Sequence, residues 1–305
     1  MASAEFLAHQ SVSLATPIVL AALGETIVEC AGVMNLGIEG AMLTGAFFGV
    51  LGSYYSGSAE VGLCVGIAAA LVFQLIFAWA TLYIRANEII AGTAANLLAF
   101  GSTAVLWRAT LGLHGDRTQV ARFPEIHVPI VSEIPFIGNL LFQHHIITYL
   151  TFISIAAVWL LLEKTSFGMR LRACGESPAS AAAFGIHVVR TRFIAILLCG
   201  VFAGTAGAAL SLAEAGTFVD GMSSGRGFVA IALVLFGGHR VLRISAFSLL
   251  FGAALAFQFG LQASGNSEIP PEFFRSLPYV LSLIVLAVVM ERRRVPASLG
   301  RGLPQ

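Results

Sequence analysis

Residues 163–192 read EKTSFGMRLRACGESPASAAAFGIHVVRTR, and the rest of the chain is arranged around this stretch. It is a polar interruption with a strong positive bias. Its basic residues are Lys164, Arg170, Arg172, Arg190 and Arg192. Apolar runs long enough to cross a bilayer lie on both sides of it, and basic loops between such runs favour the cytoplasmic side. The stretch therefore predicts a membrane protein with a cytoplasmic loop at 164–192.

A short helix is predicted inside this loop. The sequence Gly175-Glu176-Ser177-Pro178 is typical of a turn that leads into a helix. The residues from Ala179 to Phe184 are rich in alanine, and Gly185 is a typical helix stop. We expect this helix to be exposed and to be a docking element, although a basic loop that only fixes the topology would have the same charge.

The composition excludes a soluble domain. Hydrophobic residues make up 57% of the 305-residue chain and charged residues 11%, and the mean hydropathy is +0.88. Soluble chains contain about a quarter charged residues. Because apolar runs recur throughout, we expect a single transmembrane domain covering 1–305. The net charge of +1, with basic residues in separate loops, argues against nucleic-acid binding.

The fold class predicted is all-α and polytopic. A spanning helix needs about twenty apolar residues. Nine segments are predicted, near 11–31, 33–53, 61–84, 88–110, 146–163, 193–213, 225–238, 244–264 and 274–291. The weakest are 33–53, which is rich in glycine, and 225–238, which is short enough to be a half-helix.

The distribution of arginine predicts the orientation. Arg240, Arg243 and the run Arg292–Arg294 should lie in the cytoplasm with the 164–192 loop. Counting back through nine segments places the N-terminus outside, and the first ten residues contain no Lys or Arg. The C-terminus is then cytoplasmic, 111–145 is an external loop, and the tail after Arg294 is expected to be flexible.

Three carboxylates lie in otherwise apolar sequence. Glu25, Glu29 and Glu39 would each cost at least a few kcal/mol in hydrocarbon, so they should face the bundle interior or a wet cavity. Glu25 and Glu29 are four residues apart and share one helical face. They are the groups that an ion-coupled transporter would use.

A break in the helix is expected between the first two segments. Gly32, Gly37 and Gly40 weaken a helix there, and non-helical backbone at membrane depth must be satisfied by protein or water. Asn35 and Glu39 are therefore pathway or gating candidates. The alternative is that both only hydrogen-bond the broken backbone.

Two further polar residues are candidates for the transport pathway. Asn96 lies within the 88–110 segment, where it could also be a hydrogen-bonding contact between helices. Glu214 begins a polar turn with Asp220 and Arg226. These three could pair with one another at the outer surface or contact the cargo or its carrier.

The motifs of common catalytic and metal sites are absent from the sequence. It has no GxxxxGK[ST] phosphate loop, no HExxH, no GxSxG and no EF-hand loop. Four histidines fall in the external loop, but His144 and His145 are adjacent, which is a poor ligand spacing. We therefore expect no catalytic, cofactor or metal site, and an energy source outside the chain or in an ion gradient.

Several motifs resemble those of one transporter family. They are Asn35-Leu-Gly-Ile-Glu-Gly40 with Ala41-Met-Leu-Thr-Gly-Ala46, the loop from Gly175 to Ile186, Glu214-Ala-Gly-Thr-Phe218, and the run from Gly225 to Gly237. The chain resembles, over nearly its whole length, the permease subunit of bacterial ABC importers for ribose-like sugars and nucleosides, in the branched-chain amino acid/ribose permease superfamily.

This resemblance implies partners and a set of coupling residues. The implied partners are a dimer of cytoplasmic ABC ATPases, a second and often non-identical permease, an extracytoplasmic substrate-binding protein and the lipid bilayer of the bacterial inner membrane. The family carries its coupling helix in the matching loop, at Gly175, Glu176, Ser177, Pro178, Ala179, Ala182, Gly185 and Ile186. One departure concerns the turn after Gly238, where the family usually has Trp and Pro and this chain has His239-Arg240.

Other functions remain open at the level of sequence. A branched-chain amino acid ABC permease is the nearest alternative within the resemblance. An ion-coupled secondary transporter that uses Glu25, Glu29 and Glu39 is the alternative outside it. A membrane enzyme is disfavoured by the missing catalytic motifs.

Overall fold

The computed structural model describes residues 4–111, 120–127, 143–263 and 295–300. Its α-helices are α1 (Ala4–Cys30), α2 (Ile38–Ser56), α3 (Ala59–Ala78), α4 (Glu88–Thr110), α6 (Ile146–Lys164), α7 (Ser166–Glu176), α8 (Pro178–Ala183), α9 (Val188–Ala208), α10 (Arg226–Gly237) and α11 (Val241–Ala263). Two π-helical segments, η1 (Trp79–Tyr83) and η3 (Ala209–Ala215), extend α3 and α9. The strands β1 (Glu125–His127) and β2 (Gln143–His145) form a short antiparallel pair.

Within these residues the predicted all-α class is confirmed apart from that strand pair. Six helical stretches are long and apolar enough to cross a membrane: Phe6–Cys30, Ala59–Tyr83, Glu88–Thr110, Ile146–Lys164, Val188–Ala215 and Val241–Gln262. They correspond to six of the nine predicted segments. The remaining three differ from the prediction or lie outside the described residues. The predicted span 33–53 begins five residues too early, because its helix is α2 (Ile38–Ser56), and neither α2 nor the 12-residue α10 in 225–238 is among the six candidate spans. The segment 274–291 lies outside the described residues.

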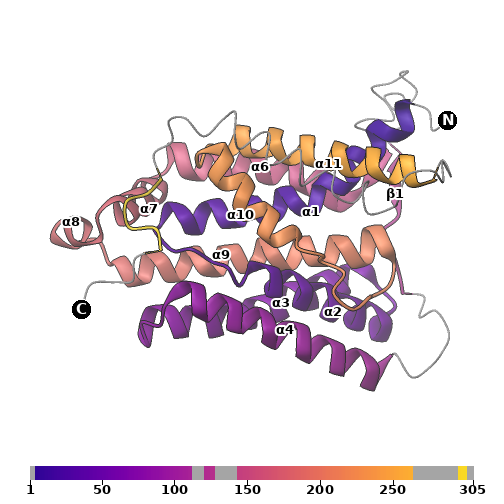
Figure 1. The fold of residues 1–305 in the computed structure, drawn as a ribbon, viewed down its shortest axis with the longest axis horizontal. Helices are drawn as coiled ribbons and strands as arrows, with labels where there is room; N and C mark the ends of the chain where they lie inside the picture. Colours follow the sequence, from indigo (N-terminus) through magenta and orange to yellow (C-terminus); the bar gives the residue numbers. More distant parts are fainter. Residues whose placement is uncertain (1–3, 112–119, 128–142, 264–294, 301–305) are drawn as a thin grey trace.

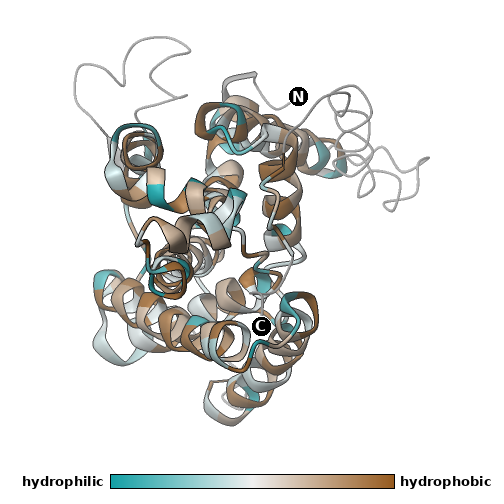
Figure 2. Cartoon of the chain, turned by 90° about the vertical axis from the view of Figure 1, so that its left-hand side faces the viewer, coloured by the Kyte–Doolittle hydropathy of each residue, from teal (hydrophilic) through white to brown (hydrophobic). Residues whose placement is uncertain are grey.

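α1 and α2 form the centre of the bundle. α1 packs against α11, α9, α10 and α6, and α2 packs against α3, α9 and α4 (Figure 1). Hydrophobic residues lie on the outward faces of the helices as well as the inward ones (Figure 2), as expected for helices that contact lipid. The same faces include exposed side chains such as Leu97, Val105 and Ile153.

Small residues allow α2, α3 and α9 to approach closely. A Cβ atom added to Gly204 would lie 2.8 Å from the Ile67 Cα, and one added to Gly45 would lie 2.8 Å from the Gly204 Cα. One added to Gly207 would collide with the carbonyl oxygen of Met42. The GxxxG-like spacing in α9 therefore serves packing within the chain.

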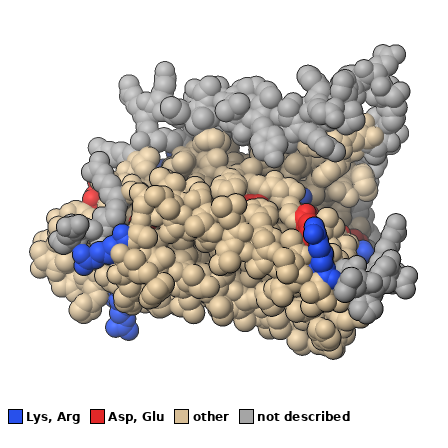
Figure 3. Space-filling model, turned by 60° about the horizontal axis from the view of Figure 1, so that its bottom comes forward, with Lys and Arg blue, Asp and Glu red and all other residues tan. Residues whose placement is uncertain are grey.

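The charged residues gather at the two ends of the bundle. Figure 3 shows blue Lys and Arg side chains near either end, and a surface between them that is almost entirely tan. At the end that holds α7 and α8, the exposed basic residues are Arg85, Lys164, Arg170, Arg172, Arg190, Arg240 and Arg243. We call this the basic end. Arg108, Arg122 and Arg226 lie toward the opposite end.

Two of the predicted loops are altered by the structure. The 164–192 loop is mostly helical: it contains α7 in addition to the predicted short helix α8. Sequence reasoning missed α7 because that helix is short and polar and lacks the long apolar run of a span. Of the predicted external loop at 111–145, only Leu111, 120–127 and 143–145 are described.

Candidate functional site

A break between α1 and α2 returns the chain to the middle of the bundle. α1 ends at the basic end, and residues 31–37 run back as non-helical backbone to the start of α2 (Figure 1). Asn35 in this link contacts Cys199, which lies about 17 Å along α9 from its first residue at 1.5 Å per residue. The predicted break is therefore confirmed, and it lies at membrane depth.

Buried polar side chains supply hydrogen-bond partners to the N–H groups of this non-helical backbone. Glu25 Oε1 accepts a hydrogen bond from the Asn35 backbone N–H at 3.0 Å, and Glu88 Oε2 accepts one from the Met34 N–H at 2.8 Å. The Asn35 amide donates to the Cys199 sulfur at 3.4 Å, and the Cys199 thiol lies 3.8 Å from Glu25 Oε2. Non-helical backbone can persist in a membrane only with such partners.

Asn96 holds the start of α2. Its Oδ1 accepts from the Gly40 N–H at 2.8 Å, and its Nδ2 donates to the Leu36 carbonyl at 2.8 Å. The first N–H groups of a helix lack partners within that helix, so the amide of Asn96 supplies one from α4. Asn96 is thus a contact between helices, one of the two roles predicted for it.

Glu39 caps a second helix at the same level. Its Oε1 accepts from the Gly225 N–H at 2.8 Å and its Oε2 from the Gly227 N–H at 2.7 Å, and its side chain is fully buried. A carboxylate at a helix N-terminus is favoured by the helix dipole. Because a Cβ on Gly227 would lie 2.7 Å from Glu39 Oε2, only glycine allows this close contact. The starts of α2 and α10 therefore meet at one carboxylate.

Glu214 reaches the same helix start through Arg226. Its Oε2 lies 3.1 Å from Arg226 Nη1, and both side chains are at most 20% exposed. Asp220 pairs with Arg108 instead, at 3.6 Å. Of the interpretations offered by the sequence, the structure supports an ion pair for Glu214, and it separates Asp220 from that pair.

Glu29 pairs with the residue that departs from the family pattern. His239 Nε2 lies 2.7 Å from Glu29 Oε2, and His239 has a left-handed backbone conformation with φ of 59°. Burial lowers the pKa of His239 to about 4, so the imidazole is neutral at pH 7. The pair ties the end of α1 to the turn between α10 and α11.

Each of the four predicted pathway residues thus lies at or bonds to the start of α2 or of α10: Asn35 and Asn96 at α2, Glu214 at α10 through Arg226, and Glu39 at both. We call Asn35, Glu39, Asn96 and Glu214 the junction residues. Each has a hydrogen-bonding partner in the chain, while the Asn35 Oδ1 atom is buried without one in the described part of the molecule. Gln74 of α3, whose side chain packs beside Gly200, was missed by sequence reasoning because a lone Gln in an apolar run carries no motif.

At the basic end, α8 forms where the sequence predicts it. Ser177 is its N-cap and accepts from the Ser180 N–H at 3.3 Å, Pro178 is its first residue, and Gly185 follows it with φ of +80°. α8 packs against α7 and α9, and it projects at the left end of Figure 1. The side chain of Phe184, just after α8, is 87% exposed.

The predicted coupling residues lie in and around α8. Glu176, Ala179, Ala182 and Gly185 are exposed, Ser177, Pro178 and Ile186 are partly buried, and Gly175 is fully enclosed. A Cβ on Gly175 would collide with the Cys30 carbonyl at the end of α1. The root of α8 is thus in direct contact with a central helix, while its outer surface is free to meet another molecule.

The tail segment 295–300 clamps this root. The prediction of a flexible tail is wrong for these residues, because Ser298 is only 7% exposed. Its N–H and its hydroxyl both donate to the Gly175 carbonyl, at 2.9 and 2.7 Å. Its Oγ also accepts from Arg192 Nη2 at 3.2 Å, and Arg192 Nε donates to the Ala31 carbonyl at 3.0 Å. Four segments therefore meet at Ser298.

Curated transporter permeases are similar to the chain over nearly its whole length. Among curated proteins, the chain is 32% identical to the putative glucose ABC transporter permease protein TsgC13 of Haloferax volcanii, covering 96% of this chain and 94% of that protein. It is 32% identical to the guanosine ABC transporter permease protein NupQ of Bacillus subtilis, over 94% and 92% of the two chains. It is also 32% identical to the nucleoside ABC transporter permease protein NupC of Lactococcus lactis, over 93% and 92%.

No solved structure matches this chain. A family profile, in contrast, covers almost all of it, from residue 7 to residue 290. That family lacks an ATPase site of its own, which agrees with the missing phosphate-binding loop in this sequence. The chain is a multi-pass membrane protein that belongs to the family described as branched-chain amino acid transport system / permease component.

Proposed function

We propose that this chain is the permease subunit of an ATP-driven ABC importer and forms the translocation pathway for a nucleoside or a simple sugar. The observation that carries the proposal is the full-length similarity to permeases named for guanosine, nucleosides and glucose. The absence of a nucleotide-binding motif in the sequence agrees with an ATPase on a separate subunit.

The partners follow from the same reasoning. A dimer of ABC ATPases binds at the basic end, a second permease completes the pore, and an extracytoplasmic binding protein delivers the cargo. The B. subtilis relatives NupQ and NupP are both named guanosine ABC transporter permeases, and this chain is 32% and 25% identical to them. This supports a pair of non-identical permeases.

The contacts suggest how motion could pass from the ATPase to the pathway. A push on α8 moves Gly175, which contacts the Cys30 carbonyl at the end of α1. Glu25, five residues earlier in α1, holds Asn35 and so the start of α2. Displacement of α8 is thereby passed to the junction residues, where α2 and α10 begin.

The decisive experiment is uptake of labelled guanosine, glucose and leucine into cells that express the intact transport system. We expect uptake of the nucleoside or the sugar, loss of uptake on ATP depletion and resistance to a protonophore. Uptake that is abolished by a protonophore but survives ATP depletion would favour the ion-coupled alternative. Uptake of leucine alone would favour the amino acid alternative.

A substitution in α8 tests the site of coupling. Ala182 is exposed, so Ala182→Arg should leave insertion and folding intact while it blocks docking of the ATPase. We expect ATPase activity stimulated by the binding protein to collapse. Ser56→Arg, an exposed position at the opposite end of the bundle, is the matched control and should retain activity. Unchanged transport in Ala182→Arg would remove α8 from the mechanism.

A further inference from the structure

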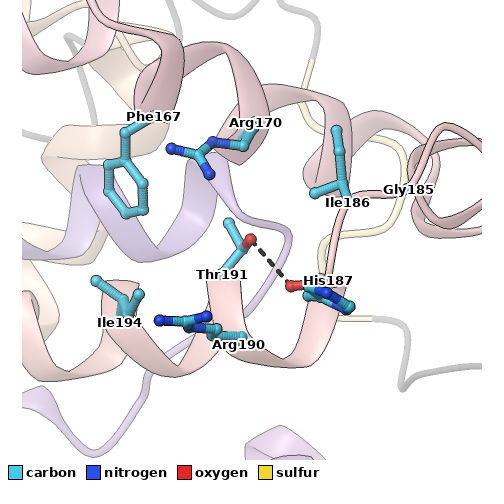
Figure 4. Close-up of a pocket in the computed structure, with 8 residues that line it drawn as sticks. All are labelled: Phe167, Arg170, Gly185, Ile186, His187, Arg190, Thr191 and Ile194. Carbon is cyan, nitrogen blue, oxygen red and sulfur yellow. Dashed lines mark hydrogen bonds between the residues drawn. The ribbon is translucent and has the colours of Figure 1, made fainter.

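A cavity of about 350 Å³ lies between α7 and α9 at the basic end. Figure 4 shows Arg170 and Phe167 on α7 facing Arg190, Thr191 and Ile194 on α9, with His187 at the start of α9. We call this cavity the α7–α9 hollow. Its volume is in the range that accommodates a small ligand or a lipid headgroup.

The hollow combines two cations that have no anionic partner in the described chain. Among the described residues, neither Arg170 nor Arg190 has a carboxylate within 4 Å. The carboxylate of Glu163 pairs instead with Arg172, at 3.6 Å. Arg170 uses one N–H on the Ser166 carbonyl at 3.4 Å and lies 5.9 Å from the centre of the Phe167 ring. The remaining N–H groups of both guanidinium groups are available to an anion, and guanidinium groups match the geometry of phosphate oxygens.

The apolar part of the hollow extends into the membrane-spanning part of α9. Ile194 lies six residues after Val188, about 9 Å along the helix. Phe167 lies three residues after Lys164, the last residue of α6, which is also a candidate span. Gly185 and Ile186, which follow α8, complete the lining of the hollow. A lipid places its phosphate at the interface and its acyl chains alongside the helices, which fits two cations next to apolar side chains that continue into a span.

We propose that the α7–α9 hollow binds the phosphate of an anionic phospholipid, with Arg170 and Arg190 as its ligands and Phe167 and Ile194 against the first part of an acyl chain. Basic pockets between membrane helices bind anionic headgroups in this way. The bound lipid joins α7 to α9 beside the root of α8. This assignment stands on the hollow itself and does not depend on the cargo or on the coupling role of α8.

The test measures lipid binding to the purified transport complex by native mass spectrometry and by thermal unfolding in detergent. The probes are phosphatidylglycerol, zwitterionic phosphatidylcholine and inorganic phosphate. We expect phosphatidylglycerol to remain bound and to raise the unfolding temperature, and the other two to do neither. Arg170→Gln with Arg190→Gln should weaken its binding at least about tenfold, the factor expected for loss of one charge-assisted hydrogen bond.

Arg240→Gln with Arg243→Gln is the matched control, because both residues are exposed at the basic end outside the hollow. This control should bind phosphatidylglycerol like the unmodified protein, and an equal loss in both double variants would overturn the site. Stabilisation by inorganic phosphate alone would overturn the lipid assignment, as would release of the lipid when the ATPase assembles. Arg190→Lys keeps the positive charge but lacks the planar guanidinium group, so it should retain part of the lipid binding. Because this change is conservative, it separates loss of the binding site from a folding defect.

Discussion

At the residue scale, the carboxylate of Glu39 acts as a cap for a helix that begins inside the membrane. Both of its oxygens accept from backbone N–H groups of α10, at 2.8 and 2.7 Å. In Glu39→Gln one oxygen is replaced by an amide donor, so one buried N–H loses its acceptor. We expect the variant to lose about 1–3 kcal/mol of stability and to show reduced uptake and reduced yield of the assembled complex.

The measurement is thermal unfolding of the purified permease in detergent, together with uptake in cells. Glu60→Gln is the control, because Glu60 is exposed and caps nothing in the membrane interior. An unfolding temperature and uptake equal to those of the unmodified protein would show that Glu39 is dispensable as a cap.

His239 gives the permease a predictable dependence on pH. Burial lowers its pKa to about 4, below the value near 6.5 of an exposed histidine. Between pH 6.5 and 4 the unfolded chain therefore binds a proton that the folded chain does not. Stability from this residue is complete above pH 6.5 and is lost as the pH falls, by about 2–3 kcal/mol at pH 4.5 for a shift of this size.

His239→Gln retains a donor for Glu29 but does not titrate. We expect the unfolding temperature of the unmodified protein to fall more steeply than that of the variant between pH 7.5 and pH 4.5. His187→Gln, at an exposed position of the same end, should follow the unmodified protein. Parallel curves for His239→Gln and the unmodified protein would show that the imidazole titrates normally.

At the scale of elements, local signals in the sequence predicted some helices and not others. α8 was predicted from Ser177-Pro178 and Gly185 because caps and stops act over a few residues. The short apolar run at 225–238 was counted as a weak segment that could be a half-helix, and α10 there has 12 residues. The contact between Glu39 and the start of α10 joins residues 186 and 188 positions apart, so no local pattern indicates it.

The contacts of the tail segment 295–300 are a second case that no local sequence pattern indicates. Ser298 bonds to Arg192 and Gly175, which are 106 and 123 residues away, and its own surroundings in sequence carry no periodicity. The packing of Ser298 in this position also depends on Gly32, because a Cβ atom there would collide with the Ser298 hydroxyl. Close packing of this kind follows from the assembled fold and is not visible in any one segment.

Ser298→Ala tests whether the tail holds the root of α8. The change removes the hydroxyl and leaves Arg192, which is 1% exposed, without that acceptor. We expect a loss of about 1–2 kcal/mol of local stability and faster amide hydrogen exchange in residues 166–186. Hydrogen–deuterium exchange of the purified permease measures this directly.

Ser56→Ala provides the control, because its hydroxyl is exposed at the opposite end of the bundle. That change should leave exchange in α7 and α8 as it was. Exchange in residues 166–186 that is the same in Ser298→Ala and in the unmodified permease would mean that the tail only rests on α7.

At the scale of the whole molecule, charge and helix breaks divide the protein along its long axis. The basic end gathers most of the exposed Lys and Arg side chains of the described residues, together with α8 and the docked tail (Figures 1 and 3). The junction residues lie deeper, where α2 and α10 begin. Because basic residues favour the cytoplasm, this arrangement predicts that α8 and the tail face the ATPase and that the turn after α2 faces outside.

Cysteine labelling checks this orientation. Cys64 is exposed and the other three cysteines are buried, so Cys64→Ser gives a background with little reactivity toward a membrane-impermeant maleimide. Into it we would introduce Phe184→Cys after α8 or Tyr55→Cys near the end of α2, whose native side chains are 87% and 74% exposed. In cells that lack the ATPase partner, we expect Tyr55→Cys to be labelled in spheroplasts and Phe184→Cys only in inverted vesicles. The reverse pattern would place the basic end outside, and ATP-driven coupling through α8 would then be impossible.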